Sequence, residues 1–515
     1  MLFSGIKSHL LCVIIDYLSA FRYYQFIVYQ CFNSKNDSDR YFSTFIPECA
    51  YARSKNYAYD DNGYFFNYSP KHLAVRKRNR NFAALLLNYI REMRKYAKIF
   101  CKSHMIVERN KYLNQLLESR HNGLTKVITG MRRSGKSFLL FNLLKNRLID
   151  EGTDREHIIE MQFDDFANKR YRNPEVFYEY VKSRITDGRK YYVLLDEVQL
   201  LSEFVDVLNG LMRIENVDLY VTGSNARFLS KDIITEFRGR GQQIHVSPFS
   251  FSELMTFFDG TKEEALEMYM KYGGLPPVVL QPNDEYRSNL LKSLLNETYI
   301  IDILERNRVR NSAGLEELLA VLASGIGGLT NPQKLSNTFK TIKNVSIGAA
   351  TLKSYIDYFA DAFLIEQASR YDVKGKKYIG TPMKYYFTDL GLRNALLNFR
   401  QMEKTHQMEN VIYNELRNRG YNVDVGVVTF NGKDAEGKSY RSQLEVDFVC
   451  NKGNERIYLQ SALALPTQEK IDQETNSLRR IDDGFQKIVV TGDHSLTSHD
   501  DHGILFINIY DFLNM

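Results

Sequence analysis

Short apolar segments alternate with longer segments of helical periodicity from residue 105 onward. The apolar segments predict five strands, at 124–129, 158–163, 191–195, 219–222 and 243–246. Helical patterns lie between them, at 137–148, 173–185 and 204–214. The segment 191–195 is apolar throughout, as expected of a strand whose two faces are both covered by helices. Residues 105–250 are therefore expected to form an α/β core with a parallel, doubly wound sheet.

Amphipathic helices are predicted after this core. The patterns at 250–272 and 289–306 would form a helical lid, assigned to residues 251–310, with a rigid turn at 273–277. Three more helical patterns are followed by alternating segments that predict a hairpin; the helices are 315–326, 331–342 and 349–364. Three helices and a hairpin are typical of a winged helix, which is assigned to residues 311–400.

Polar residues on this module indicate where a partner would lie. The third helix is expected to turn outward Thr351, Lys353, Ser354 and Tyr355, and the hairpin carries Arg370, Lys374, Lys376 and Lys377. Two interpretations stay open. The helix could enter a DNA groove while the basic hairpin contacts phosphates, or the module could pack only against the core or a protein.

Residues 401–515 predict a separate mixed α/β domain. Its helices are expected at 408–418 and 467–481, and its strands at 421–429, 443–450, 456–464, 485–491 and 504–509. A glycine-containing hairpin tip is expected at 434–438.

The first 104 residues have a different pattern. Their hydrophobic positions follow no sustained period before 82–99, and the apolar run 10–28 is interrupted by Asp16 and Arg22. That run falls short of the roughly 18 clean apolar residues of a membrane helix, and it lacks the features of a signal peptide. We expect a poorly packed extension; the alternative is a membrane-surface or partner-binding segment.

Composition narrows the class of protein. A chain of 515 residues is too long for one core, so two to four domains are expected. The net charge of +6 is compatible with nucleic acid without being diagnostic. The five cysteines form no CxxC pair, so neither a zinc site nor a disulfide framework is indicated, and a reduced cytoplasmic protein is expected.

The strongest chemical signal lies between the first predicted strand and its helix. The residues from Gly130 to Ser137 fit the phosphate-binding pattern G-x-x-x-x-G-K-[ST]. Lys136 would reach the β- and γ-phosphates, and the Ser137 hydroxyl would ligate Mg²⁺. The main-chain amides that open the helix would face the phosphates. The predicted nucleotide-binding residues are Gly130, Arg132, Arg133, Ser134, Gly135, Lys136, Ser137 and Phe138.

Polar residues at later strand ends complete this prediction. Asp196 and Glu197 follow the third strand, where Asp196 would hold Mg²⁺ and Glu197 would orient and deprotonate the attacking water. Ser224 and Asn225 follow the fourth strand and are candidates to sense the γ-phosphate. Further on, a guanidinium from Arg238 or Arg240 could act on a neighbouring subunit's nucleotide as an arginine finger. A plain surface role for these arginines stays open.

Several segments together resemble one family. They are GMRRSGKS, LLDEVQ, TGSNARFLS, FRGRGQQIHVSPFSFSEL and YMKYGGLPPVV. They are similar to bacterial and archaeal AAA-superfamily ATPases of uncharacterised role that carry a C-terminal domain of unknown function. The resemblance covers about residues 105–515 and implies ATP as the nucleotide and an oligomer as the active form. Family members often show Leu-x-Gly-Arg where this chain has Phe237 to Arg240, so the identity of the finger stays open.

The C-terminal domain resembles the restriction-endonuclease-like fold. In that fold Glu409 and Asp447 would hold a metal ion and Gln460 would take the third position, with Glu445 on the same strand face as Asp447. The fourth position, where a lysine is needed, is Ala462. Loss of that charge predicts a degenerate, non-cleaving domain.

These patterns favour an ATP- and Mg²⁺-dependent ATPase that drives a switch coupled to the winged helix and the C-terminal domain. Two alternatives stay open: a nucleic-acid-acting enzyme with a metal-dependent nuclease domain, and a nucleotide-binding scaffold. The expected partners are ATP, further copies of the chain, and DNA or an unidentified protein; a membrane is not expected.

Overall fold

The computed structural model describes residues 106–224, 240–342, 346–433, 439–494 and 496–515, together with the backbone of 57–59 and 65–67. The chain divides into two units, Met1–Lys98 and Ile99–Met515. In the first unit, β1 (Tyr57–Tyr59) pairs antiparallel with β2 (Phe65–Asn67). The rest of the predicted extension, residues 1–104, lies outside the described residues, and everything below concerns the second unit.

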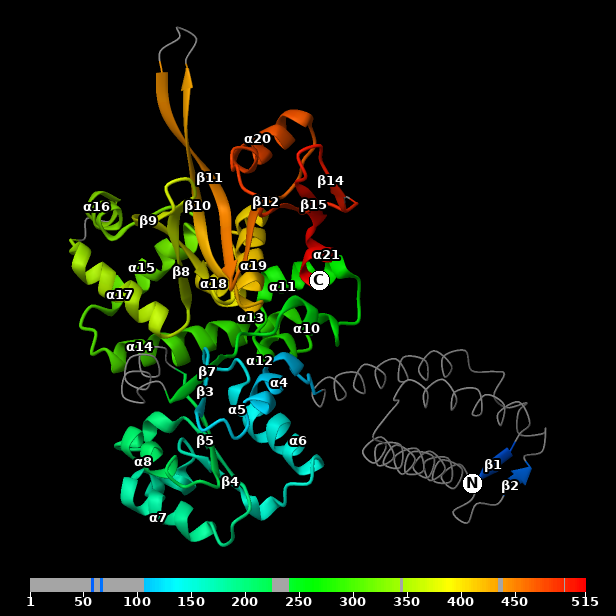
Figure 1. Cartoon of the computed structure of the whole chain (residues 1–515), viewed down its shortest axis with the longest axis vertical. Helices are drawn as coiled ribbons and strands as arrows, with labels where there is room; N and C mark the ends of the chain where they lie inside the picture. The colour runs from blue at the N-terminus through cyan, green and yellow to red at the C-terminus, as the bar shows by residue number, and fades with distance from the viewer. Residues whose placement is uncertain are drawn as a thin grey trace, which may run out of the picture. The chain divides into compact units, whose positions relative to one another are not determined.

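A five-stranded sheet forms the first part of this unit, with all neighbouring strands parallel (Figure 1). In spatial order the strands are β4 (Ile158–Gln162), β5 (Tyr191–Asp196), β6 (Val217–Thr222), β3 (Thr125–Thr129) and β7 (Gly241–His245). All residues of β3 and β5 are buried. The predicted α/β core with a parallel sheet is therefore confirmed.

Helices cover both faces of this sheet. Val127 and Val193 pack with α7 (Pro174–Arg184) and α8 (Phe204–Leu211). The next residues along, Ile128 and Leu194, point the other way, because side chains alternate along a strand. They pack with α4 (Asn110–Glu118) and with the helical run that follows the phosphate loop. That run comprises α5 (Lys136–Phe138), η3 (Leu139–Leu144) and α6 (Lys145–Asp150). Three short helices lie in the connections: η4 (Arg155–His157), η5 (Phe166–Arg172) and η6 (Val198–Leu200).

The lid region contains more helices than the hydrophobic pattern predicted. Where one helix was expected over 250–272, the chain forms α10 (Phe251–Met255) and α11 (Lys262–Tyr272). Ser250 and Thr261 each begin a helix with a capping box, and the second box stops the first helix from continuing. The remaining helices are α12 (Pro276–Val279), α13 (Asp284–Ser293), η8 (Leu294–Ile300) and α14 (Ile301–Arg306).

The next three helices and hairpin match the predicted order. They are α15 (Ser312–Ser324), α16 (Pro332–Ile342), α17 (Ala349–Asp361), β8 (Ile365–Asp372) and β9 (Lys377–Phe387). One predicted outward residue is wrong, because Tyr355 is buried and its hydroxyl donates to the Asn311 carbonyl at 3.4 Å. Tyr355 lies three residues after the buried Leu352, so it belongs to the apolar stripe of α17.

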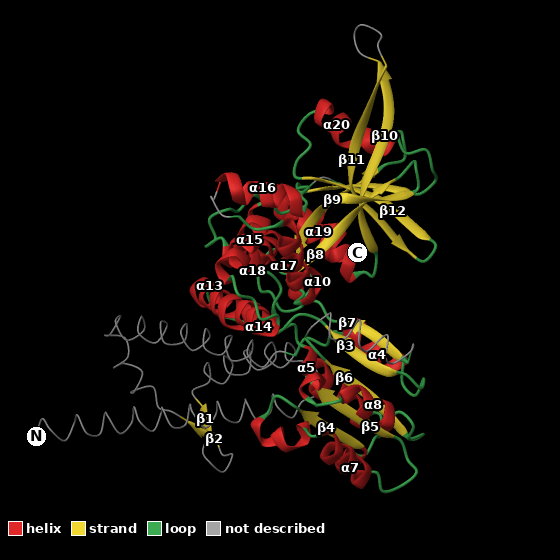
Figure 2. Cartoon of the chain, turned by 90° about the vertical axis from the view of Figure 1, so that its left-hand side faces the viewer, coloured by secondary structure: helices red, strands yellow, loops and turns green. Residues whose placement is uncertain are grey.

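The hairpin does not stand apart from the C-terminal strands. Strand β8 pairs in parallel with β10, so one eight-stranded mixed sheet crosses the boundary expected at residue 400 (Figures 1 and 2). The C-terminal strands are β10 (Asn422–Lys433), β11 (Ser439–Lys452), β12 (Glu455–Ala462), β13 (Gln486–Thr491), β14 (Ser498–His499) and β15 (Leu505–Asn508). The predicted tip at 434–438 lies outside the described residues. Figure 1 shows the long β10–β11 hairpin projecting beyond the other strands.

Four helices accompany this sheet: α18 (Leu390–Leu396), α19 (Lys404–Asn418), α20 (Gln468–Arg479) and α21 (Ile509–Asn514). Helix α19 begins four residues earlier than predicted, which places Glu409 in its second turn. A single buried cluster includes side chains from the lid, from α15 to α19 and from the C-terminal strands. Across the described ranges, no helix has both the length and the hydropathy needed to cross a bilayer.

Candidate nucleotide site

The phosphate-loop segment connects β3 to α5 through two glycines with unusual backbone angles. Gly130 has φ 141° and Gly135 has φ 96°, a region that residues with a Cβ rarely adopt. A Cβ on Gly130 would also lie 2.2 Å from the carbonyl oxygen of Val246. Glycine is therefore required at the first position by both conformation and space.

The amine of Lys136 lies inside this loop. It donates to the carbonyl oxygens of Gly130 and Met131 at 2.9 and 2.8 Å, and the side chain is buried. Burial lowers the pKa of Lys136 to about 8, against the opposing effect of Glu197 and Asp196. The amine thus has neutral oxygens as its nearest partners, and it is short of negative charge.

Asp196 lies at the carboxyl end of β5, facing the start of α5. It is buried, accepts a hydrogen bond from the Thr222 hydroxyl, and has the Ser137 hydroxyl nearby. Burial raises the pKa of Asp196, and these two hydroxyls oppose the rise. The structure therefore brings the predicted acid of β5 to the predicted serine of the loop.

Glu197 adopts a left-handed backbone conformation, with φ 50°. Its N–H donates to the Thr222 hydroxyl at 3.0 Å. Its carboxylate accepts from the Ser224 hydroxyl at 3.2 Å and from the Gln199 amide. Side chains at the end of β6 thus hold both acids of β5, although sequence reasoning named Ser224 only as a sensor and did not consider Thr222 or Gln199.

Arg109 supports the loop from outside and was not predicted. Its guanidinium donates to the Ser134 carbonyl at 2.7 Å and the Ser247 carbonyl at 2.8 Å, and it pairs with Glu253 at 3.0 Å. It is a buried arginine. No motif marks Arg109, because its partners lie 25 to 144 positions along the chain.

The other predicted loop residues differ in their contacts and exposure. The Arg132 guanidinium bonds Asp302 of α14 at 2.7 Å, and the Arg132 carbonyl accepts from the Tyr299 hydroxyl at 2.6 Å. Arg133 has φ 64°, and the Phe138 side chain is exposed. The hydroxyl of Ser134 is buried and has no hydrogen-bond partner within the described part of the chain.

Of the remaining predicted residues, Asn225 and Arg238 lie outside the described residues. Arg240 directly precedes β7, is exposed, and its carbonyl accepts from the Thr125 N–H at 2.9 Å. Its role as an arginine finger stays a prediction.

Comparisons with known proteins identify the domains of this chain and its relatives. A family model described as "AAA domain" matches residues 122–255, and one described as "Domain of unknown function (DUF8612)" matches residues 263–403. An uncharacterised protein of Haemophilus influenzae is 31% identical over 417 residues, covering 80% of this chain and 99% of that protein. The chain belongs to the same family as this Haemophilus protein, and residues 122–255 form its AAA domain. The uncharacterised protein MJ1544 of Methanocaldococcus jannaschii is 26% identical, covering 71% of this chain and 84% of that protein.

Two solved structures also align with this AAA-domain chain. The Aeropyrum pernix ORC1 protein, solved in complex with DNA, is 13% identical with a TM-score of 0.29, covering 57% of this chain and 93% of that one. Cdc6p of Pyrobaculum aerophilum is 13% identical with a TM-score of 0.26, covering 57% and 94%. At these scores neither structure supports an argument about the present chain.

A second polar group lies in the C-terminal part of this AAA-domain protein. Glu409 of α19 and Glu445 and Asp447 of β11 converge on the amine of Lys384, a residue of β9; we call the three acids the carboxylate cluster. The distances from the Lys384 amine to these acids are 2.9, 2.7 and 3.9 Å. Sequence reasoning found the acids but not the lysine, because Lys384 was assigned to the hairpin of another module.

The expectation that this cluster lacks a positive charge is therefore wrong. Ala462, at the position where a lysine was sought, is buried and carries no charge, yet Lys384 brings an ammonium from β9, at the edge of the same sheet. The predicted Gln460 lies beside the cluster, where its side-chain oxygen accepts from the Asp447 N–H at 3.3 Å.

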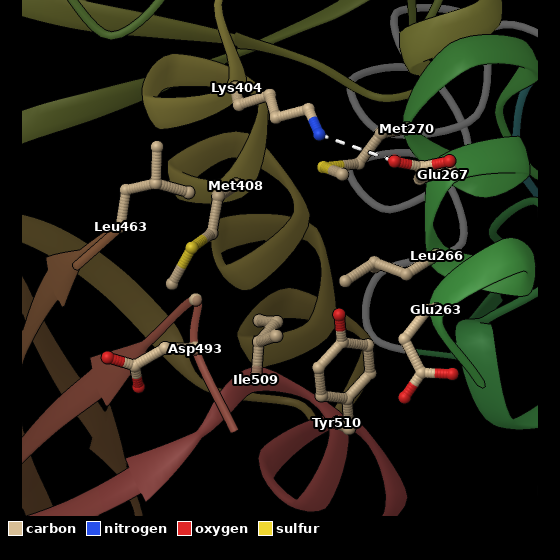
Figure 3. A pocket seen from close by; sticks show the side chains of 11 residues that line it. Glu263, Leu266, Glu267, Met270, Lys404, Met408, Leu463, Asp493, Ile509 and Tyr510 are labelled. Carbon is tan, nitrogen blue, oxygen red and sulfur yellow. Dashed lines mark hydrogen bonds and ion pairs between the residues drawn. The ribbon is translucent and has the colours of Figure 1, made fainter. Parts of the chain in front are cut away.

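A cavity of about 300 Å³ lies apart from both groups (Figure 3). It is bounded by α11, α19 and the C-terminal end of the chain, and Leu266, Met408 and Ile509 form apolar parts of its wall. At its edge Lys404 donates to Glu267 at 3.3 Å. None of the predicted functional residues lines this cavity.

Proposed function

We propose that this protein binds ATP with Mg²⁺ and hydrolyses it, and that hydrolysis drives a switch in the rest of the second unit. The observation that carries the proposal is the meeting of three groups at one sheet edge. These are the buried amine of Lys136, the Ser137–Asp196 pair and the Glu197 carboxylate. Ligands of open parallel sheets bind at this carboxyl edge.

The loop is suited to a triphosphate. Main-chain amides from Gly130 to Phe138 and the helix N-terminus would receive the phosphates. The Lys136 amine would exchange its two carbonyl partners for phosphate oxygens, which carry the negative charge it lacks. The unpartnered, buried Ser134 hydroxyl supplies a further donor at the same loop.

The residues present also fit Mg²⁺. This ion prefers oxygen ligands and is bound in phosphate sites by one or two protein oxygens together with substrate phosphates. Ser137 and Asp196, whose side-chain oxygens face the same edge, would be those protein ligands. When bound, the ion neutralises charge that develops on the β- and γ-phosphate oxygens.

Glu197 is the proposed base for the attacking water. Ser224 and Gln199 orient its carboxylate, and Thr222 holds its backbone. Because Thr222 also bonds Asp196, the two acids are positioned by one hydroxyl. Asn225 is proposed as a γ-phosphate sensor, and Arg238 or Arg240 as a finger acting between copies of the chain.

Two contacts support the switch: one links the loop to the lid, and the other links the lid to the start of α18. Arg132 of the loop is tied to Asp302 of α14. Gly274, in the turn before α12, donates its N–H to the buried Asp389 at 2.8 Å, directly before α18. A change at the phosphates could therefore move the lid and, through Asp389, the hairpin and its sheet.

The exposed lysines of the β8–β9 hairpin favour nucleic acid as the partner of this switch. Lys374, Lys376 and Lys377 are all exposed, next to the exposed ring of Tyr378. Basic side chains beside an aromatic ring suit phosphates and a stacked base. Measuring the ATPase rate with and without DNA, alongside mass by light scattering with ATP bound, tests this partner and the proposed oligomer together.

The decisive test of the function is Glu197→Gln. We expect phosphate release by the full chain to fall at least about 100-fold while ATP binding persists, because the base is lost and the loop is intact. Glu203→Gln is a matched control, since Glu203 also has φ 50° at the start of a helix but is exposed and lies outside this network. Equal turnover in Glu197→Gln would reject Glu197 as the base. Absence of turnover in the unaltered chain, with ATP still bound, would favour a scaffold.

A further inference from the structure

Three elements meet at Lys384. Lys384 and Tyr386 are two residues apart on β9 and so point to the same face. Glu445 and Asp447 are likewise two residues apart on β11. Glu409 of α19 accepts from the Lys384 amine at 2.9 Å and from the Tyr386 hydroxyl at 2.7 Å.

The three acids share the ammonium of Lys384 as their nearest cation. Burial and the neighbouring Glu409 raise the pKa of Asp447, and the Lys384 ammonium opposes the rise. Burial also acts to raise the pKa of Glu409, but the nearby His406 ring and the hydrogen bonds from Lys384 and Tyr386 outweigh it and lower the pKa. The pKa of Lys384 is raised by these acids despite burial.

The same arrangement is poorly suited to a divalent metal. A metal held by Glu409 and Asp447 would have to share them with an ammonium that lies within 3.9 Å of both. The metal ion and the ammonium would then lie in the same buried site, where like charges repel strongly. Within the described ranges, no group of three or more acidic, histidine or cysteine side chains has the geometry to hold a metal ion.

We propose that Lys384 is the resident cation of the carboxylate cluster, in the place that a divalent metal would take. The cluster is then an ionic junction that ties α19 and β11 to β9, and it does not cleave nucleic acid. This proposal does not rest on the nucleotide site. The junction would hold together a continuous segment of the second unit, because β9 leads through Asp389 and α18 into α19.

The test combines metal binding and thermal unfolding of the full chain with MnCl₂ as the probe. Calorimetry is expected to show that the unaltered chain and the Asp447→Asn variant bind Mn²⁺ equally, because the cluster of the unaltered chain does not hold the ion. Lys384→Met is expected to lower the melting temperature by about 10 °C, because it leaves buried acids without their cation. Mn²⁺ should restore much of this loss in Lys384→Met and none of it in the Lys384→Met/Asp447→Asn double variant.

Two results would overturn the proposal. One is Mn²⁺ binding, or nicking of plasmid DNA, by the unaltered chain that Asp447→Asn abolishes. The other is a Lys384→Met variant that melts with the unaltered chain. If Lys384→Met cannot be obtained folded, the first comparison still decides, because it needs only the unaltered chain and Asp447→Asn. Lys384→Arg then serves as the charge-preserving control and is expected to show no gain in Mn²⁺ binding.

Discussion

Two buried lysines of this protein have opposite surroundings. Lys136 donates to two carbonyl oxygens of its own loop, and its pKa is lowered to about 8 by burial. Lys384 is equally buried but contacts three acids, and its pKa is raised. Burial costs both ammonium groups their hydration, and only Lys384 regains that loss from nearby charge. Lys136 therefore has no carboxylate in direct contact and can accept a phosphate, whereas Lys384 is already paired with carboxylates.

The largest effect that would separate the two sites is on nucleotide binding. Lys136→Ala is expected to weaken ATP binding by at least about 100-fold, because it removes a cation directed at the phosphates. Fluorescent ATP titration would measure this. Lys145→Ala is a control from the same helical run. The Lys145 amine pairs with Glu160 at a distance of 3.0 Å, and neither residue belongs to the loop. Retained micromolar affinity in Lys136→Ala would refute the role of the loop.

Thermal unfolding without nucleotide should sharpen the contrast. Lys136→Met is expected to melt within about 2 °C of the unaltered chain or higher, since a lysine with a lowered pKa is not stabilised by its charge. Lys384→Met should fall by about 10 °C, as above. A large loss in Lys136→Met would show that its two carbonyl bonds outweigh the cost of burying its charge.

The smallest expected effect is on pH dependence. Below pH 8 Lys136 is charged and ATP affinity should change little; above pH 8 the amine is neutral in the free protein. A bound triphosphate raises the pKa of this amine, so binding there must take up a proton. Affinity is then expected to fall by up to about tenfold per pH unit between pH 8 and 10. Calorimetry in buffers of different ionisation enthalpy would detect the proton, and Lys136→Ala should show no such uptake. A flat profile would contradict the lowered pKa.

Sequence reasoning worked best where the functional residues are adjacent in the chain. The loop from Gly130 to Ser137 is contiguous, and Asp196 and Glu197 end a strand that is apolar along its length. Their meeting at one edge follows from the parallel sheet, which the alternation of strands and helices already predicted. Thr222 and Gln199 lie inside the segments TGSNARFLS and LLDEVQ but were given no role, and Arg109 belongs to no motif. Their part in holding the site was therefore missed.

Reasoning was weaker where pairing between distant segments decides the outcome. The break between α10 and α11 could have been read from the Thr261 capping box, but the apolar period continues across it. Tyr355 was predicted to face outward because it was assigned to the DNA-contacting face of the third helix. Its spacing from Leu352 places it in the buried stripe instead. The union of β8 with β10 leaves no local trace, since a parallel partner can lie anywhere in the chain.

By itself, the sequence determined an α/β core, a phosphate loop and the acids that face it, because periodicity and short motifs act over a few residues. Only the tertiary structure decided that Lys384 meets Glu409, Glu445 and Asp447. These four residues lie on three different elements. The three acids share a recognisable sequence pattern, and the lysine is not part of it. The reason is physical: the charge of a buried cluster depends on what lies within a few ångströms in space, and only the folded chain brings β9 close to α19 and β11.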